Sequence, residues 1–545
     1  MCTNRAGIVA LCISCMFLGQ FCGCIGNGGN AGMNGNTLPP LATNGKSLTA
    51  PVPVKTAPIL AGAIVNKGIV AEFEDTPMAD EELSIFSSRA AITFWESSNI
   101  VYAVDSYENA MRVSSLAAID DSPILLWGKT SENAVKKLNA LNVIGIGNLP
   151  PGICSRILVD NRDVINYSIE RKLPIRGYLS VVNPNSSDPA SALAPLLTAL
   201  RNGVLLTVNG SGANYVHGIV YSIVRDLSDA GIKVDCLAIF GGMESINHYK
   251  TQITLTSATG SFEEEIYTDN FYGCAITDNL ESLAVPEIAV GRIIALNLTA
   301  AKELFARYAC YGNNSGDWRN NAVICNANEV PEADPQSGIT LSILNMNIVF
   351  MGANYNTYTS TAVITRVGRQ TLLERISNAN FIYSITNQDA NGTRIFADVA
   401  RFNPGIVVDC DAIKEESIKR VNWTHYRVLG TGANAYVAPL LNSWFGISGE
   451  ISANISRVVP EEDELLQLAK GFFKEMIENN KSIGIALRDA KKSFVGEHPY
   501  DGVASMTSMA FTLYGDPAFN PYEPCNEGKN RLFETGLFHQ RAHQV

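Results

Sequence analysis

The sequence is poor in histidine, in charge and, beyond its first residues, in cysteine. Six histidines occur in 545 residues, and charged side chains make up 17%, below the roughly 25% that is usual for soluble domains. Five of the twelve cysteines precede residue 25, so seven remain in the other 521 residues. Such sparse cysteine excludes a small disulfide scaffold. After residue 24 there is no Cys-x-x-Cys, and His-Glu-x-x-His is absent throughout, so no motif predicts a zinc site.

The balance of charge excludes another class. Lysine and arginine number 41 against 53 acidic residues, a net charge of −12, which argues against a general nucleic-acid binder because such proteins need a basic surface. The hydrophobic share of 46% is too high for a disordered body. The length predicts about three domains.

The amino terminus is typical of an export signal. Residues Ala6–Phe21 form an apolar run of sixteen after Arg5, which is short for a membrane span and suited to a signal peptide. The following Gly23-Cys24-Ile25-Gly26 resembles the processing site of archaeal lipoproteins, and this resemblance implies a lipid on Cys24. Cleavage elsewhere and a short membrane anchor are the alternatives. We therefore expect residues 1–24 to be a signal peptide and the protein to be anchored at the cell surface.

Residues 25–60 contain glycine, asparagine and proline without apolar periodicity. This composition predicts a flexible tether. We expect it to hold the folded body close to the membrane.

The body alternates short apolar runs with stretches of helical spacing, which predicts α/β layers with parallel sheets flanked by helices. The first expected strands are Ile100–Val104, Pro123–Trp127, Val143–Gly147, Arg156–Val159, Tyr178–Val182, Val204–Val208 and Cys236–Phe240. A second series is Ala322–Cys325, Ala362–Arg366, Phe381–Ile385, Gly405–Asp409 and Ala435–Ala438. Between and after them we expect helices, including Ser106–Ile119, Ser131–Leu141, Ala190–Arg201, Val216–Ala230, Glu461–Asn480 and Ser482–Phe494.

Residues 99–147 combine a strand, a helix, Pro-Ile-Leu-Leu, a second helix and Val-x-x-Ile-Gly. This order resembles the cell-wall-binding repeat of prokaryotic surface proteins, and residues 204–242 echo its second half. Any βαβ unit is the alternative reading. We therefore predict an amino-terminal α/β domain over residues 61–234.

Four segments resemble the gingipain family of cysteine peptidases, which has a caspase-like α/β fold. They are Cys236–Gly242, the Thr268-Asp269-x-x-Tyr272 turn with Pro286–Arg292, the strand Gly405–Cys410, and the helix from Ile483 that leads to Gly515-Asp516-Pro517. The resemblance implies a caspase-like domain over residues 235–525, followed by a tail at 526–545.

The family's chemistry uses a cysteine nucleophile and a histidine in a Gly-His-Gly turn. The matching positions here are Cys410 and Asn387, and no histidine occurs between His248 and His425. Asparagine cannot exchange a proton near neutral pH, so the general base is missing there. The neighbouring Asp409 and Asp411 would also disfavour a thiolate at Cys410. A Cys410/His425 dyad in reversed order, and a cysteine that is only a small buried apolar residue, are the alternatives.

Two further motifs are weak. Gly430–Ala435 fits a dinucleotide fingerprint, but Ala435–Ala438 reads as a strand where that motif needs a helix. Four acidic positions could bind calcium, although turn or surface roles fit them better: Asp269, Asp278, Glu281 and Glu287. Apart from this calcium alternative, we expect no cofactor.

Three hypotheses on function follow. The first is a surface-anchored peptidase homologue with a degenerate dyad that acts by binding, a pseudoenzyme. The second is an active cysteine endopeptidase that uses Cys410. The third is an envelope-binding adhesin whose binding lies mainly in residues 99–240. The expected partner is a polypeptide or an envelope component, and the oligomeric state is open.

Overall fold

The computed structural model describes residues 52–68, 73–74, 78–257, 260–275, 280–311, 316–326, 338–360, 366–385, 396, 398–410, 424–440, 464–499 and 501–521. The signal peptide, Cys24, most of the tether and the tail lie outside these residues. The chain divides into two compact units, residues 1–174 and 175–545. Among the described residues no helix is long and apolar enough to cross a membrane.

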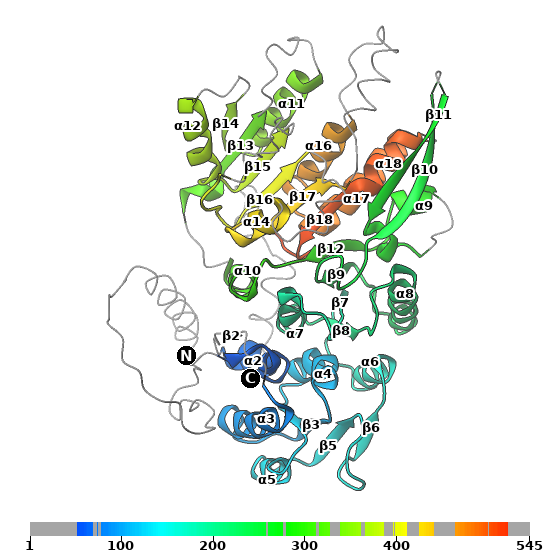
Figure 1. Cartoon of the computed structure of the whole chain (residues 1–545), viewed down its shortest axis with the longest axis vertical. Coiled ribbons are helices and arrows are strands. Elements are labelled where there is room, and N and C mark those ends of the chain that lie inside the picture. Colours follow the sequence, from blue (N-terminus) through cyan, green and yellow to red (C-terminus); the bar gives the residue numbers. More distant parts are fainter. Residues whose placement is uncertain are drawn as a thin grey trace. The chain divides into compact units, whose positions relative to one another are not determined.

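Unit 1 is a parallel sheet with its own core. Its strands are β3 (Ile100–Val104), β4 (Ile124–Leu126), β5 (Asn142–Ile146) and β6 (Arg156–Leu158), in the order β4-β3-β5-β6 (Figure 1). Its helices are α2 (Ala57–Lys67), α3 (Asp80–Phe94), α4 (Tyr107–Ile119), α5 (Ser131–Lys137) and α6 (Asn161–Glu170). A short parallel pair is formed by β1 (Val52–Pro53) before α2 and β2 (Phe73–Glu74) after it. Side-chain caps begin two of the helices, because Ser106 accepts from the N–H of Asn109 and Asp160 from that of Asp163.

Unit 2 contains a ten-stranded sheet in the order β14-β13-β15-β16-β17-β18-β12-β9-β7-β8. Its strands are β7 (Tyr178–Val182), β8 (Val204–Thr207), β9 (Cys236–Phe240), β12 (Ala289–Ile293), β13 (Asn321–Asn326), β14 (Asn356–Ser360), β15 (Phe381–Ile385), β16 (Ile406–Asp409), β17 (Ala435–Pro439) and β18 (Phe511–Gly515). All neighbours are parallel except β17 and β18. The sheet therefore consists of two parallel halves that run in opposite directions and meet at this antiparallel pair.

Helices cover both faces of the β13–β17 half. Phe381 of β15 packs with Phe350 of α11 (Gly338–Gly352) and Phe473 of α16 (Glu464–Ile477). Its neighbour Ile382 points the other way and joins a core with residues of α12 (Arg366–Ile376) and α14 (Thr424–Gly430). We call these the α16 face and the α14 face.

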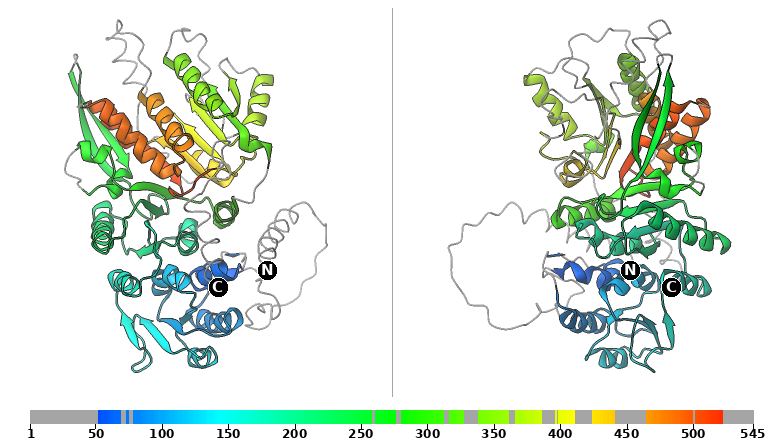
Figure 2. Two further views of the ribbon diagram at one scale, coloured as in Figure 1. Left: turned by 180° about the vertical axis from the view of Figure 1, so that it is seen from behind. Right: turned by 45° about the vertical axis from the view of Figure 1, so that its right-hand side comes forward.

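The rest of unit 2 completes the layers. The other helices are α7 (Ala194–Leu200), α8 (Ala213–Asp229), α9 (Leu280–Ala284), α10 (Leu298–Cys310), α17 (Ile483–Glu497) and α18 (Gly502–Ala510). A separate hairpin of β10 (Tyr249–Ser257) and β11 (Gly260–Thr268) extends away from the large sheet (Figure 2).

The expected α/β class is confirmed, but the predicted domain boundary between residues 234 and 235 is wrong. Strand β7 pairs with β9 from Tyr178↔Cys236 to Val182↔Phe240, and β8 pairs with β7. Residues 175–234 therefore belong to the sheet of unit 2. The echo at 204–242 is part of that sheet and not a second copy of the unit 1 pattern.

One expected strand, Ala362–Arg366, lies outside the described residues except for Arg366, which begins helix α12. A strand that was not expected, β14, lies just before it at Asn356–Ser360. The Thr-rich run Asn356–Ser360 lacks the Val/Ile pattern on which the prediction relied.

Candidate active site

The site that the sequence singled out lies where β15 and β16 end. Cys410 follows β16 directly, and its N–H donates to the carbonyl of Ser384 at 2.9 Å. The ends of the two strands are therefore adjacent. Asn387 is only two residues beyond β15, but it and Asp411 lie outside the described residues.

The two residues at the end of β16 point to opposite faces of the sheet. The Cys410 thiol is 2% exposed and donates to the hydroxyl of Tyr383, with sulfur and oxygen 3.8 Å apart. Asp409 is fully buried on the α14 face and accepts from Tyr436 at 2.8 Å. On the α14 face, burial raises the pKa of Cys325 to about 12, and Asp409 contributes to this rise.

His425 packs on the α14 face. Its ring lies 4.8 Å from that of Tyr426 and 4.7 Å from that of Tyr514, and both tyrosines belong to the α14 core. The Cys410 thiol lies with Tyr383 on the α16 face. These contacts thus place His425 beside Tyr514 and Cys410 beside Tyr383.

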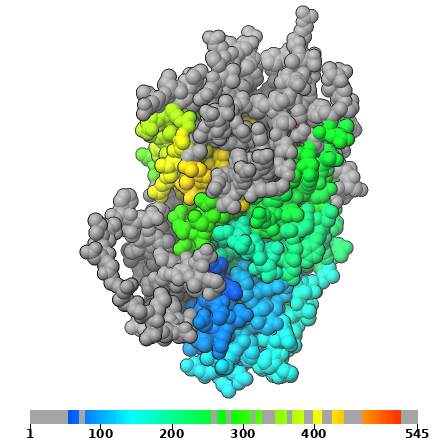
Figure 3. Space-filling view, viewed as in Figure 1, coloured from blue at the N-terminus to red at the C-terminus, as the bar shows by residue number. Residues whose placement is uncertain are grey.

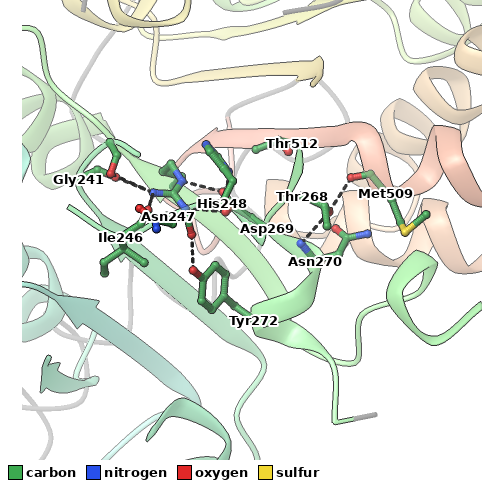
Figure 4. Close-up of polar contacts among 12 residues, drawn as sticks. Gly241, Ile246, Asn247, His248, Thr268, Asp269, Asn270, Tyr272, Met509 and Thr512 are labelled. Carbon is green, nitrogen blue, oxygen red and sulfur yellow. Dashed lines mark hydrogen bonds and ion pairs between the residues drawn. The ribbon is translucent and has the colours of Figure 1, made fainter. Parts of the chain in front are cut away.

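A buried charge cluster forms a second polar centre that the sequence pattern left unassigned. Arg292 of β12 makes a bidentate pair with Asp269, with Nε–Oδ2 2.8 Å and Nη2–Oδ1 2.6 Å. His248 contacts Asp269 Oδ1 through Nδ1 at 2.8 Å (Figure 4). Arg292 also donates to the carbonyls of Gly241 and Ile246 at 2.9 and 2.8 Å. All the polar partners lie within the cluster, so we call it the Asp269 cluster and assign it to the scaffold.

Electrostatics holds this cluster in one charge state. Burial opposes ionisation of Asp269, but Arg292 and then His248 outweigh it and hold the pKa of that carboxyl well below its usual range. Burial, aided by Arg292, lowers the pKa of His248. The stable arrangement is therefore a carboxylate and a guanidinium beside a neutral imidazole.

These contacts correct the calcium alternative at Asp269. Both of its oxygens are taken by Arg292 and His248, and it is buried, not a surface residue. Glu287 accepts from the N–H of Ala275 at 2.6 Å. Asp278 and the side chain of Glu281 lie outside the described residues. Within the described part of the chain no three His, Cys, Asp or Glu side chains are grouped to hold a metal ion.

Lys491 is a buried residue that the sequence reading missed. It is 3% exposed on α17, and its Nζ donates to Asn270 Oδ1 and to the carbonyl of Phe511, both at 2.6 Å. Burial lowers its pKa to about 7. The signal was present in the sequence, because Lys491 follows Leu487 by four and precedes Phe494 by three, which places it on the apolar stripe of the helix.

The glycine-rich segment before β17 is a turn and not a nucleotide loop. A strand, β17, follows it. Gly432 has φ +136°, and a Cβ there would lie 2.1 Å from the carbonyl oxygen of Phe402. The chain therefore needs glycine at this point for backbone geometry alone.

Unit 2 is thus an α/β fold with a cysteine at the end of a central strand. Residues 219–400 match the model of peptidase family C25. Over these residues the chain is similar to the gingipain family, as the resemblance implied.

Solved structures are similar at low identity. They include the Arg-specific cysteine proteinase gingipain R (13% identity, TM-score 0.46, 64% of this chain and 78% of that chain) and the complex of Porphyromonas gingivalis RgpB pro- and mature domains (13%, 0.44, 63% and 79%). Cwp6 from Clostridium difficile is a more distant likeness (11%, 0.29, 80% and 77%). No curated protein matches the sequence.

Proposed function

We propose that this chain is an exported, membrane-tethered surface protein, a gingipain-type peptidase homologue that binds a polypeptide without cleaving it. The observation that carries the proposal is the setting of Cys410. Its thiol stands at the end of β16 but is 2% exposed and donates to the Tyr383 hydroxyl. A phenolic hydroxyl is no general base near neutral pH, whereas peptide cleavage by cysteine needs one.

The histidines support the same reading. Asn387 stands at the family's histidine position, and residues 249–424 contain no histidine. His217 contacts the carbonyl of Cys274, and His248 is held by Asp269. The apolar leader and Cys24, which lie outside the described residues, support export and a lipid tether.

The test uses the chain from residue 25, with a thiol-reactive peptide probe and casein as substrate. We expect casein to bind without cleavage and Cys410 to stay unlabelled. Cys410→Ala should bind casein as the wild type does, and Cys325→Ala, which removes another buried thiol, is the matched control. Cleavage that Cys410→Ala abolishes and Cys325→Ala leaves intact would establish the active endopeptidase instead. If Asn387→His gains labelling at Cys410, the missing imidazole is the cause of the inactivity.

Unit 1 gives the envelope alternative a physical basis, because residues up to 174 form a compact unit with a core of their own. An envelope-binding activity would then reside in residues 52–174 and not in 99–240 as the sequence predicted. Binding of this fragment to isolated envelopes, with none by residues 175–545, would favour the adhesin over the polypeptide binder.

A further inference from the structure

The outer strand of unit 1, β6, presents an open apolar edge. Among the described residues its only strand neighbour is β5. Ile157 is 59% exposed and Val159 is 70% exposed, and the part of the chain that includes β6 lies on the surface of unit 1 (Figure 3). Edge strands are usually protected by short length, by charged side chains, by proline or by a bulge. Strand β6 has three residues and one charged side chain, Arg156. The segment Arg156–Asp160 contains neither lysine nor proline.

The opposite face of this strand carries Leu158, which is buried in the core of unit 1, between two ordered charged residues. The Arg156 guanidinium lies 4.8 Å from the centre of the Tyr167 ring and pairs with Glu170 at 2.5 Å. Asp160 caps α6 by accepting from the N–H of Asp163 at 3.0 Å, and its backbone is extended, with φ −141° and ψ −174°. The extended chain therefore runs to Asp160 with its end charges held in place.

The sequence of this edge is complementary to itself. When two copies pair antiparallel about Leu158, Ile157 of one copy lies opposite Val159 of the other, and Arg156 lies opposite Asp160. The first pairing joins two exposed aliphatic side chains, and the second joins opposite charges. Both kinds of cross-strand pair stabilise antiparallel sheets. A register displaced by one residue would mix the two faces.

We propose that β6 is a homodimerisation edge, at which a second copy of this chain adds its own β6 antiparallel across a two-fold axis centred on Leu158. The pairing joins two four-stranded sheets into one of eight strands. It covers Ile157 and Val159 of both copies and satisfies main-chain groups along the open edge. The interface is isologous, so it closes at two copies and does not propagate.

The test is sedimentation velocity of the chain from residue 25 over a concentration series up to about 1 mM, the range in which a small interface gives a measurable dimer. We expect a concentration-dependent dimer. Val159→Lys should raise its dissociation constant about tenfold or more, because it places an ammonium against Ile157 of the partner copy. The matched control is Ile348→Lys, at a 60% exposed aliphatic residue of unit 2, and it should leave the dimer unchanged.

Charge exchange tests the register. Arg156→Asp and Asp160→Arg should each weaken self-association, and an equimolar mixture of the two variants should form a heterodimer because every cross-strand pair again joins opposite charges. Circular dichroism confirms that each variant is folded, since Asp160→Arg also removes a helix cap. A wild type that stays monomeric throughout the series overturns the proposal. Equal weakening by Val159→Lys and Ile348→Lys, or a mixture that dimerises no better than its components, overturns it as well.

Discussion

The buried ammonium of Lys491 should make the stability of unit 2 depend on pH in a way that one substitution removes. Lys491 joins α17 to Asn270 and to β18 through two short hydrogen bonds. Its neighbours Cys274 and Asp269 favour the charged form, but desolvation outweighs them and lowers its pKa. We therefore predict that Lys491→Met changes the pH dependence of unfolding, and not only the stability at one pH.

The magnitude follows from the pKa in the two states. The pKa falls from 10.5 to about 7 on folding, a difference of about 3.5, which corresponds to about 5 kcal/mol at about 1.36 kcal/mol per unit. Between pH 7 and 10.5 the unfolded chain carries one more proton at this site than the folded chain. The free energy of unfolding therefore rises with pH in this window, by at most about 1.4 kcal/mol per pH unit. Below pH 7 both states are protonated, and the full penalty remains.

The assay is urea unfolding between pH 7.5 and 9.5, with the difference between wild type and Lys491→Met as the measured quantity. Other groups that titrate in this range cancel in that difference. The variant leaves two acceptors without their donor, which costs about 1–3 kcal/mol each, but this loss is the same at every pH and shifts only the intercept. Lys492→Met, at the adjacent exposed lysine, is the matched control and should keep the wild-type slope.

Parallel lines for wild type and Lys491→Met would refute the reasoning, because they would show that Lys491 binds the same number of protons in both states. A difference of opposite sign would mean that the folded state favours the ammonium. A desolvated lysine requires that the free energy of unfolding of the wild type rise more steeply with pH than that of Lys491→Met, by the slope of about one proton. Lys492→Met should show the same slope as the wild type.

Two further predictions concern the scaffold. Gly432→Ala should destabilise unit 2 by about 2 kcal/mol or more in thermal or urea unfolding, because its φ is +136° and the new Cβ would lie 2.1 Å from a carbonyl oxygen. The control Gly218→Ala, in helix α8 with nothing within 4 Å, should instead stabilise unit 2 by about 0.5–1 kcal/mol. Equal effects of the two substitutions would contradict this account. Asp269→Asn should lower the free energy of unfolding by about 3–5 kcal/mol, because it leaves Arg292 buried without a counter-charge. This difference from the wild type should shrink at acid pH, because the wild type loses the stabilisation due to Asp269 as pH falls through its lowered folded pKa. A difference that is constant with pH would contradict an ionised Asp269.

Local pattern was enough to predict much of the fold. The strands Ile100–Val104, Tyr178–Val182, Cys236–Phe240 and Phe381–Ile385 lie where expected, because runs of Val, Ile and aromatic residues buried on both faces have few other structures open to them. The hairpin β10–β11 was missed, since its threonine- and glutamate-rich strands lack such runs. Sheet membership was also beyond the local pattern. Nothing within residues 178–207 distinguishes a strand of unit 1 from one of unit 2, because that choice depends on the pairing of β7 with β9.

The candidate site divides in the same way. The position of Cys410 at a strand end follows from sequence, because a buried strand followed by a polar turn is a local feature. The face of the sheet to which its thiol points cannot be predicted from sequence. A shift of one residue in the strand would place the thiol beside Tyr436 instead of Tyr383. The Asp269 cluster depends on residues from three separate segments, so sequence could point to Asp269 and Arg292 but not to their bond.

The family match and the activity are therefore separate questions in this chain. The matched region, residues 219–400, contains His248, Asp269 and Arg292, which hold one another in a buried cluster. It ends before Cys410 and includes Asn387, the residue predicted to stand at the family's histidine position. Such a buried ion pair belongs to the scaffold, because removing one of its partners costs several kcal/mol. Loss of a catalytic imidazole costs the fold little, so a chain can keep the scaffold and lose the chemistry, and only the reactivity of Cys410 distinguishes the two.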